Sequence, residues 1–463
     1  MKIDRRNTRP LSWIEIAVMT AVAVGLTIGS MLHHLPCTVL PGPGVARITQ
    51  LSQWGCASDV GGMFTIHDYA AHVFPYVSPH ADASGLPLGT PEYPTLTAIW
   101  IWLTGLPVVS AHGFVIVTAL TFLPLVALAT IMLARVAGRR AWIFAATPPL
   151  YLYALLNWDV IPVFFVSAAL FVELGLRDRI PPWVRALIAG ALLGIGGAFK
   201  LYPALFVCPL VLAYLIEAGV PLARRVRDAA VVAGSAVAVL LAANVPFLVI
   251  NAAGWWSVIR FQASRPIEPD TLSVWYYALL PWSAQATPSV EHTLNRMAQV
   301  ATALGLLTVV VIGLVIGIRR RQMPWVQTAA AMICIYMVCN KVDSPQYTLW
   351  LLPFFVVVRL RIGWIIAYLG VDLATFVGYF RDIYYNSIGH TEATWAHFLL
   401  YAGIAGHIVL LPIIAGVCLA SGVARPRAVT DRSVDDPEAP AHLPEASADV
   451  PERAPGELAA PLA

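Results

Sequence analysis

Long apolar runs, interrupted at intervals by arginine, constrain this chain more than any other feature of its sequence. Of its 463 residues, 59% are hydrophobic and 12% are charged, whereas a soluble domain has about 25% charged residues. A soluble fold cannot bury so much apolar surface, and a disordered chain needs low hydrophobicity and high charge. The formal net charge of +3 is too small to indicate a nucleic-acid partner. We therefore expect a protein that crosses a membrane several times.

Twelve apolar runs meet the length criterion for a spanning helix. They are 11–32, 114–134, 142–156, 160–176, 186–199, 201–215, 229–250, 298–318, 325–339, 348–358, 363–380 and 398–420. If each run crosses once, the arginine clusters at 135–140, 177–179, 224–227, 319–321 and 359–361 all fall on one side. That side is the cytoplasm, because Lys and Arg are retained there. The sequence thus predicts an all-α polytopic membrane protein with about twelve transmembrane helices and cytoplasmic termini.

Two segments do not fit this pattern of crossings. Residues 95–109 are apolar, but a crossing there would place the arginines at 135–140 outside. We expect them to form a re-entrant or interfacial piece that the bundle covers. Residues 421–463 are rich in Pro, Ala and acidic residues, which is typical of disorder. The predicted organisation is a transmembrane domain over 1–420 and a disordered cytoplasmic tail over 421–463.

Lysine is nearly absent from the chain, and its placement is unusual. Lys2, Lys200 and Lys341 are the only lysines, and the predicted topology puts Lys200 and Lys341 at the outer face. Cations that oppose the positive-inside bias suggest a bound anion. The alternative is that each one reaches a lipid headgroup or pairs with a neighbouring carboxylate.

Two predicted outer loops, 33–94 and 251–297, are much longer than connecting helices requires, and such loops are usually functional or disordered. Both loops are rich in aromatic side chains, which can form an interfacial belt, stack on sugar rings or pack the loop. The first loop also holds Cys37 and Cys56, and a disulfide between them is a hypothesis.

Five short strings occur in the predicted outer segments. They are Ser58-Asp59, Glu92-Tyr93-Pro94, Asn157-Trp158-Asp159, Lys200-Leu201-Tyr202-Pro203 and Lys341-Val342-Asp343-Ser344-Pro345-Gln346-Tyr347. In this order they resemble the polyprenyl-phosphate-dependent membrane glycosyltransferases of the GT-C superfold. Among these, the chain is most similar to glycosyltransferase family 87, which includes actinobacterial phosphatidylinositol mannosyltransferases and arabinofuranosyltransferases. The resemblance extends to about residue 420 and does not specify the sugar.

The resemblance implies a catalytic acidic residue in the first outer loop, a position that Asp59 matches. A positioned carboxylate can take the proton of an acceptor hydroxyl as the new glycosidic bond forms, and a single displacement inverts the anomeric centre. The departing polyprenyl phosphate needs cations or hydrogen-bond donors. The candidates for that role are Lys200, Lys341, Arg260, Arg265, Tyr202 and Tyr347. A further set of candidates would contact the sugar or the acceptor, or would orient the loops. They are Asp68, His67, Glu92, Tyr93, Asp159 and Gln346.

Several of these residues have a structural alternative. Asp59 could cap a helix that begins near Val60, and Glu92 could orient the loop by hydrogen bonding. Asp159 and Lys200 could form an ion pair between helices. Asp343, before Ser344-Pro345, is typical of a turn. Asp68 and His67 are reserve candidates for the base.

The expected activity is transfer of a sugar, with mannose favoured, from a polyprenyl-phosphate donor to a glycolipid or glycan at the outer face of the plasma membrane. An arabinofuranosyltransferase is the nearest alternative. The sequence lacks an Asp-X-Asp motif, which disfavours a nucleotide-sugar donor, and a Gly-rich phosphate loop, which excludes a nucleotide-driven pump. We expect no cofactor and assign no metal ligands. A transporter is disfavoured because Asp372 and Glu173 are among the few acidic residues within the runs.

Overall fold

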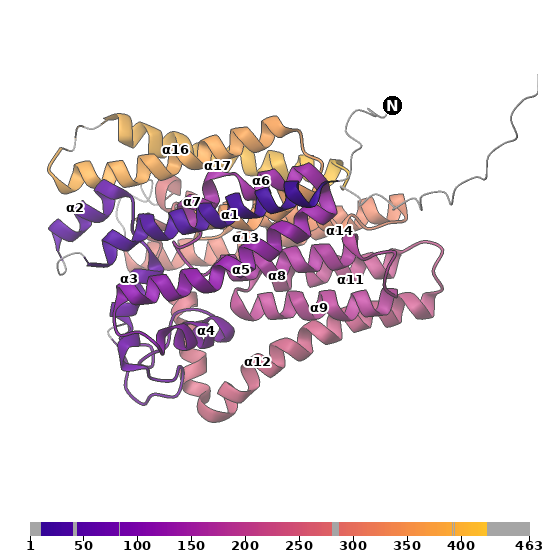
Figure 1. Cartoon of the computed structure of the whole chain (residues 1–463), viewed down its shortest axis with the longest axis horizontal. Coiled ribbons are helices and arrows are strands. Elements are labelled where there is room, and N and C mark those ends of the chain that lie inside the picture. The colour runs from indigo at the N-terminus through magenta and orange to yellow at the C-terminus, as the bar shows by residue number, and fades with distance from the viewer. Residues whose placement is uncertain are drawn as a thin grey trace, which may run out of the picture. The chain divides into compact units, whose positions relative to one another are not determined.

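The computed structural model describes residues 11–39, 44–82, 84–279, 287–390, 392 and 394–423, and these form an assembly of helices (Figure 1). Within these ranges the only β-structure is two isolated bridges, Ala81 with Pro87 and Val358 with Val423. Seven helices are long and apolar enough to cross a bilayer. They are α1 (Trp13–His34), α5 (Ala111–Ala137), α9 (Pro182–Phe199), α12 (Leu222–Ser264), α13 (Pro288–Arg320), α16 (Ile362–Ser387) and α17 (Thr394–Ala420). The prediction of an all-α multi-pass membrane protein is confirmed.

Shorter apolar helices complete the bundle. They are α4 (Thr95–Gly105), α8 (Val160–Leu170), α11 (Val207–Ile216), α14 (Trp325–Cys339) and α15 (Thr348–Val357). The predicted number of about twelve crossings stays a prediction. The prediction of a single helix over 142–156 is wrong, because this run is divided into α6 (Trp142–Ala145) and α7 (Pro148–Tyr153). Pro148 and Pro149 stand at the division, and proline cannot continue a helix from the preceding turn.

The segment predicted to be re-entrant is a helix, α4, of 11 residues. At 1.5 Å per residue it is about 16 Å long, roughly half of the ~30 Å hydrocarbon core of a bilayer. It packs against α5 and α9. Its length agrees with the predicted re-entrant placement, which stays a prediction.

Both predicted outer loops contain more helix than expected. The first holds α2 (Val45–Trp54) and α3 (Asp59–Ile66), and Cys37 and Cys56 are joined as a disulfide with their Cα atoms 6.0 Å apart. The second loop is shorter than the predicted range of 251–297. Helix α12 continues past a kink at Asn251 to Ser264, and α13 starts at Pro288. The Asn251 side chain donates to the carbonyl of Tyr76, 2.8 Å away, and so attaches the kink to the first loop.

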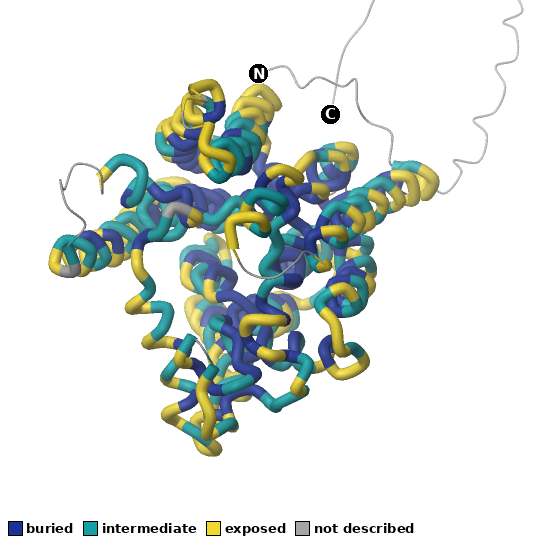
Figure 2. The backbone as a smooth tube through the Cα atoms, turned by 90° about the vertical axis from the view of Figure 1, so that its left-hand side faces the viewer, coloured by how far each residue is buried: buried dark blue, intermediate teal, exposed yellow. Residues whose placement is uncertain are grey.

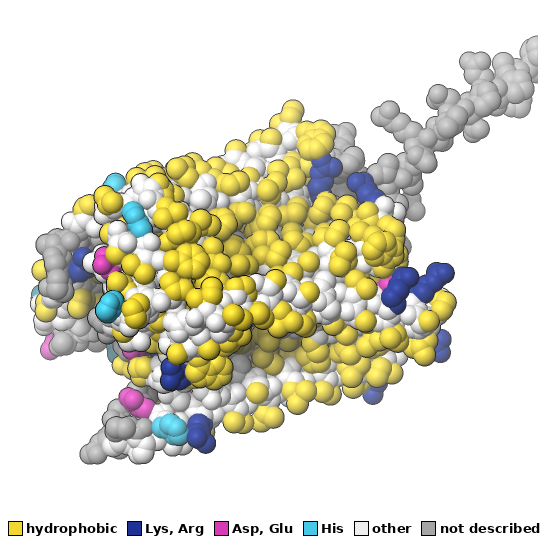
Figure 3. Space-filling model, turned by 90° about the horizontal axis from the view of Figure 1, so that it is seen from below, with side chains coloured by type: hydrophobic (Ala, Val, Ile, Leu, Met, Phe, Trp, Pro, Cys, Tyr) yellow, Lys and Arg dark blue, Asp and Glu magenta, His cyan; other side chains and the backbone are white. Residues whose placement is uncertain are grey.

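The two ends of the bundle differ in charge. At one end, which we call the arginine end, Arg139 pairs with Glu15 at 2.7 Å and Arg177 pairs with Glu217 at 3.2 Å. Arg140 donates there to the carbonyl of Val358, after α15. Figure 3 shows basic side chains gathered mainly at one end of the face drawn, beside a broad hydrophobic surface. The opposite end, which carries α2, α3 and residues 265–279, is called the loop end below.

Of the predicted tail at 421–463, only residues 421–423 are described, and there the amide of Arg359 donates to the carbonyl of Gly422 at 2.8 Å. The prediction of disorder otherwise falls on residues outside the described part of the chain.

Helices α16 and α17 lie side by side (Figure 1) and pack closely. Figure 2 shows exposed residues mainly on the outward-facing sides of the helices and on the loops. The contact between α16 and α17 depends on residues without a side chain. A Cβ atom on Gly403 would stand 2.8 Å from the amide nitrogen of Thr375 and 2.9 Å from its Cα atom. Small residues allow this approach of backbones between helices in a membrane.

Gly403→Ala should therefore lower the free energy of unfolding by about 1–3 kcal/mol, because the new methyl group meets backbone atoms of α16. Gly416→Ala on the same helix is the matched control, since a Cβ there has no atom within 4 Å. Thermal unfolding in detergent measures both variants. Equal stability of the two would show that the close contact between α16 and α17 is absent.

Candidate functional site

Asp59 lies at the loop end, where the first outer loop meets the segment between α7 and α8. Its amide donates to the carbonyl of Leu156 at 2.8 Å, and the Ser58 hydroxyl donates to the carbonyl of Leu155 at 2.5 Å. Asp59 is the first residue of α3 and Ser58 is its N-cap residue. The alternative in which Asp59 caps a helix beginning near Val60 is therefore wrong, and the Asp59 carboxyl group serves other partners.

The Asp59 carboxylate accepts a hydrogen bond from the side-chain amide of Asn157 at 2.6 Å and a longer one from the Tyr93 hydroxyl at 3.4 Å. The Asn157 amide also donates to the Tyr93 hydroxyl at 2.6 Å. Burial raises the pKa of Asp59, and the hydrogen bond from Asn157 and the charge of Lys200 oppose that rise. The Asp59 residue retains some solvent exposure. A half-buried carboxyl group with a raised pKa has the properties of a general base.

Asp159 and Lys200 form a buried ion pair, with Oδ2 and Nζ 2.8 Å apart. The other Asp159 oxygen accepts from the indole Nε1 of Trp350 at 2.6 Å. The alternative of an ion pair between helices is therefore confirmed for these two residues. The pair joins the start of α8, the end of α9 and α15, and the Asp159 carboxylate balances the charge of Lys200.

Aromatic rings surround this ion pair. Trp350 stacks on Tyr347 with ring centroids 3.7 Å apart and on Tyr202 with centroids 4.1 Å apart. The Lys200 ammonium lies 5.1 Å from the ring centroid of Tyr93 and 5.9 Å from that of Tyr347. These distances permit cation–π attraction. The rings connect the Asp159–Lys200 pair to Tyr93, which contacts Asp59.

Arg265 connects the two long loops. Its guanidinium lies 3.2 Å from Glu92, 3.4 Å from Glu268 and 3.5 Å from Asp270. Burial raises the pKa of Glu92, and Arg265 opposes that rise. The Gln262 side chain also donates to the backbone carbonyl of Glu92 at 2.6 Å. These contacts fit the loop-orienting role expected of Glu92.

Lys341 differs from Lys200 and Arg265 in its partners. Its ammonium donates to the backbone carbonyls of Arg265 at 2.7 Å and Ala263 at 3.2 Å, and no described carboxylate forms an ion pair with it. Burial, followed by repulsion from Arg265, lowers the pKa of Lys341 to about 8. Lys341 is thus a largely buried cation with no described carboxylate at ion-pair distance, although the charge of Glu268 partly opposes the lowering of its pKa.

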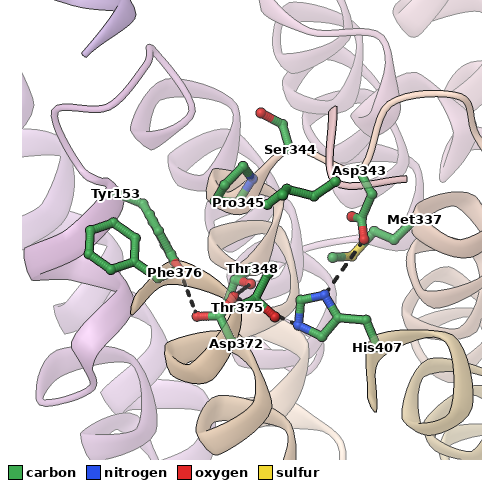
Figure 4. Close-up of a pocket in the computed structure, with 11 residues that line it drawn as sticks. Tyr153, Met337, Asp343, Ser344, Pro345, Thr348, Asp372, Thr375, Phe376 and His407 are labelled. Atoms are coloured by element: carbon green, nitrogen blue, oxygen red, sulfur yellow. Dashed lines mark hydrogen bonds and ion pairs between the residues drawn. The ribbon is translucent and has the colours of Figure 1, made fainter. Parts of the chain in front are cut away.

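A second polar cluster lies between α16, α17 and the loop that begins at Lys341 (Figure 4). His407 Nδ1 is 3.6 Å from Asp343, and Nε2 is 4.0 Å from Asp372. Asp372 also accepts from the hydroxyls of Tyr153 at 3.0 Å and Thr348 at 2.6 Å. The expectation that Asp343 supports a turn stays a prediction, and its carboxylate lies beside His407 of α17. The cavity beside the cluster has about 10 Å³, room for about one water molecule.

The remaining predicted site residues lie elsewhere or make local contacts. His67 pairs with Asp82 at 2.6 Å, and both side chains are buried. Asp68 and Arg260 are exposed and have no ion pair with a described residue. The Gln346 side chain accepts from the Ser344 hydroxyl at 2.7 Å. No group of three or more His, Cys, Asp or Glu that could hold a metal occurs among the residues that the structure describes.

Sequence reasoning missed three contributors: Asn157, Trp350 and His407. The only feature of the sequence that pointed to Asn157 as a site residue was its place in the same short string as Asp159. Trp350 follows Tyr347 by three residues, a spacing that puts both on one face of a helical segment. His407 lies in an apolar run, where a lone polar residue is itself a signal of a buried partner.

None of the known protein-family models matches the chain, and neither does any curated protein. Among solved structures, the chain is similar to the crystal structure of ArnT from Cupriavidus metallidurans bound to undecaprenyl phosphate. The TM-score is 0.44 at 16% sequence identity, over 88% of this chain and 78% of the other. Values this low do not establish a shared fold.

Lys200→Met should destabilise the protein by about 3–5 kcal/mol, because the buried Asp159 carboxylate loses its cation. The double variant Lys200→Met/Asp159→Asn should recover much of that loss, since the amide introduced at position 159 is uncharged and its oxygen could still accept from Trp350. Thermal unfolding of both variants in detergent measures the difference. A double variant no more stable than Lys200→Met would contradict a structural ion pair.

Proposed function

We propose that the chain is an integral-membrane glycosyltransferase of the GT-C type that uses a polyprenyl-phosphate-linked sugar. The observation that carries the proposal is the convergence of the five strings at the loop end. Asp59, Tyr93 and Asn157 are in mutual contact, Asp159 and Lys200 are paired beside Tyr93, and Lys341 contacts the backbone of Arg265. A carboxylate and several cations are thereby gathered from distant parts of the sequence.

In the proposed reaction, Asp59 is the general base. It removes the proton from an acceptor hydroxyl while that oxygen bonds to the anomeric carbon of the donor. The bond from that carbon to the phosphate oxygen breaks, and polyprenyl phosphate leaves with the electron pair. One displacement inverts the anomeric configuration. Asn157 and Tyr93 orient the carboxylate, and the raised pKa of Asp59 increases its basicity.

Lys341 is the proposed principal contact of the donor phosphate. The charges of Lys200 and Arg265 are already balanced by carboxylates, whereas the described partners of Lys341 are backbone carbonyls. A phosphate anion would supply the missing negative charge where it develops during the reaction. Tyr202 and Tyr347 stack on Trp350 beside the Asp159–Lys200 pair and are proposed as further hydrogen-bond donors. Arg260 would meet the phosphate only at the exposed edge.

The sugar is proposed to be mannose, on the resemblance to family 87, and the acceptor a glycolipid or glycan. Tyr and Trp rings beside the site offer stacking surfaces that suit a sugar without distinguishing mannose from arabinofuranose. We place the site at the extracytoplasmic face of the plasma membrane and both termini in the cytoplasm, because arginines gather at the opposite end of the bundle.

Asp59→Asn should reduce transfer from a polyprenyl-phosphate sugar by at least about a hundredfold, because an amide cannot accept the proton. Radiolabelled donor and extraction of the lipid product measure the rate. Asp178→Asn, which changes an exposed carboxylate at the arginine end, is the control and should retain the rate. Full activity of Asp59→Asn, with an unchanged melting temperature, would exclude Asp59 as the base.

Donor binding should weaken as the pH rises through about 8, the pKa of Lys341. The ammonium is protonated below that value and attracts the phosphate, whereas above it the neutral amine does not. Lys341→Arg keeps the charge across this range and should remove the decline, and Lys341→Met should weaken binding at every pH. The dissociation constant of polyprenyl phosphate from pH 6 to about 9.5 measures this, and an alkaline decline that persists in Lys341→Arg would contradict the assignment.

A further inference from the structure

An open groove runs along α13 at the loop end of the bundle, apart from the contacts of Asp59. It has a volume of about 590 Å³, and the side chains that define it include Trp275, His292, Arg296, Met297, Val300 and Leu304. Five of these six residues belong to α13. The groove therefore follows one helix and opens toward the surroundings of the bundle.

The groove changes in polarity along its length. His292 and Arg296 stand near the start of α13 and are exposed, and neither has an ion pair with a described residue. Met297, Val300 and Leu304 follow toward the middle of the helix, with 51%, 58% and 58% of their surface exposed. Unbalanced positive charge at one end and apolar surface beyond it match a ligand with an anionic head and a hydrocarbon chain.

The length of the groove selects among such ligands. From His292 to Leu304 the helix rises about 18 Å at 1.5 Å per residue, close to one leaflet, which is half of the ~30 Å hydrocarbon core. An acyl chain of a phospholipid fills one leaflet. A polyprenyl chain is much longer and would extend beyond Leu304.

The groove is bounded on one side by Trp275, which is held in place. Trp275 is 6% exposed and packs with Ile267 and with Leu294 and Ala298 of α13 itself. Its indole Nε1 donates to the carbonyl of Cys339 at 2.8 Å, two residues before Lys341. A preformed wall reduces the entropy cost of binding, which separates this groove from the general hydrophobic surface that any bilayer lipid covers.

We propose that the groove binds one anionic phospholipid, with its headgroup phosphate on Arg296 and an acyl chain along Met297, Val300 and Leu304. Trp275 links the groove to the end of α14, through its hydrogen bond to the carbonyl of Cys339. This binding does not depend on the proposed transferase activity, because no residue of the groove takes part in the reaction described above.

The test uses the full chain in mixed vesicles and phosphatidylglycerol with a photoactivatable group in its acyl chain, with mass spectrometry to locate the label. Label should appear within 293–304 and be displaced by unlabelled phosphatidylglycerol more readily than by phosphatidylcholine. Arg296→Ala should reduce that label about tenfold, the effect of losing a charge-assisted contact. Arg320→Ala, at the other end of the same helix, should leave it unchanged.

A second pair of variants tests the chain contact. Val300→Trp fills the groove and should abolish the label at 293–304, whereas Leu307→Trp, on the same helix and 59% exposed, should not. The proposal is overturned if Arg296→Ala labels as strongly as the unaltered protein, if phosphatidylcholine competes equally, or if polyprenyl phosphate displaces the probe better than phosphatidylglycerol. Each outcome is read without measuring sugar transfer.

Discussion

The loop end of the bundle depends on one buried ion pair, between Asp159 at the start of α8 and Lys200 at the end of α9. A buried charge is stable only when a partner and further hydrogen bonds satisfy it. Lys200 Nζ and Trp350 Nε1 supply these contacts to the two Asp159 oxygens. These contacts hold α8, α9 and α15 together at one point. The aromatic rings stacked on Trp350 and the Lys200 ammonium continue the packing toward Tyr93, which contacts Asp59.

From this ion pair, a chain of polar contacts reaches both long loops. Tyr93 contacts Asp59. Glu92, which precedes Tyr93 in the sequence, forms an ion pair with Arg265, and the backbone carbonyl of Arg265 accepts a hydrogen bond from Lys341. Most positive charges in this chain of contacts have a carboxylate partner, so they hold the loops in place and leave little charge for a ligand. Lys341 is the exception among the described cations in these contacts, and Asp59 is the carboxylate there that forms no ion pair with a described residue. The ion-paired charges therefore stabilise the loops, whereas Lys341 and Asp59 remain able to bind or react with a ligand.

The sequence predicted the seven long apolar helices well, because apolar runs of sufficient length have few alternatives in a membrane. It predicted the Asp159–Lys200 pair and the Cys37–Cys56 disulfide as possibilities, since polar residues at neighbouring helix ends must find partners. The loop boundaries were wrong because α12 continues beyond its apolar run, where hydropathy no longer marks the helix. The partners of Asp343 and Lys341 could not be predicted, because His407 and the carbonyl of Arg265 approach them through tertiary packing alone.

The central claim is that Asp59 and Lys341 act on one donor molecule from the same end of the bundle. A structure of the protein with a non-hydrolysable polyprenyl-phosphate sugar tests it most directly. The phosphate should lie within hydrogen-bonding distance of Lys341 Nζ, with the anomeric carbon facing the Asp59 carboxylate. A donor phosphate bound among the arginines at the opposite end, or a sugar that is remote from Asp59, would contradict the claim.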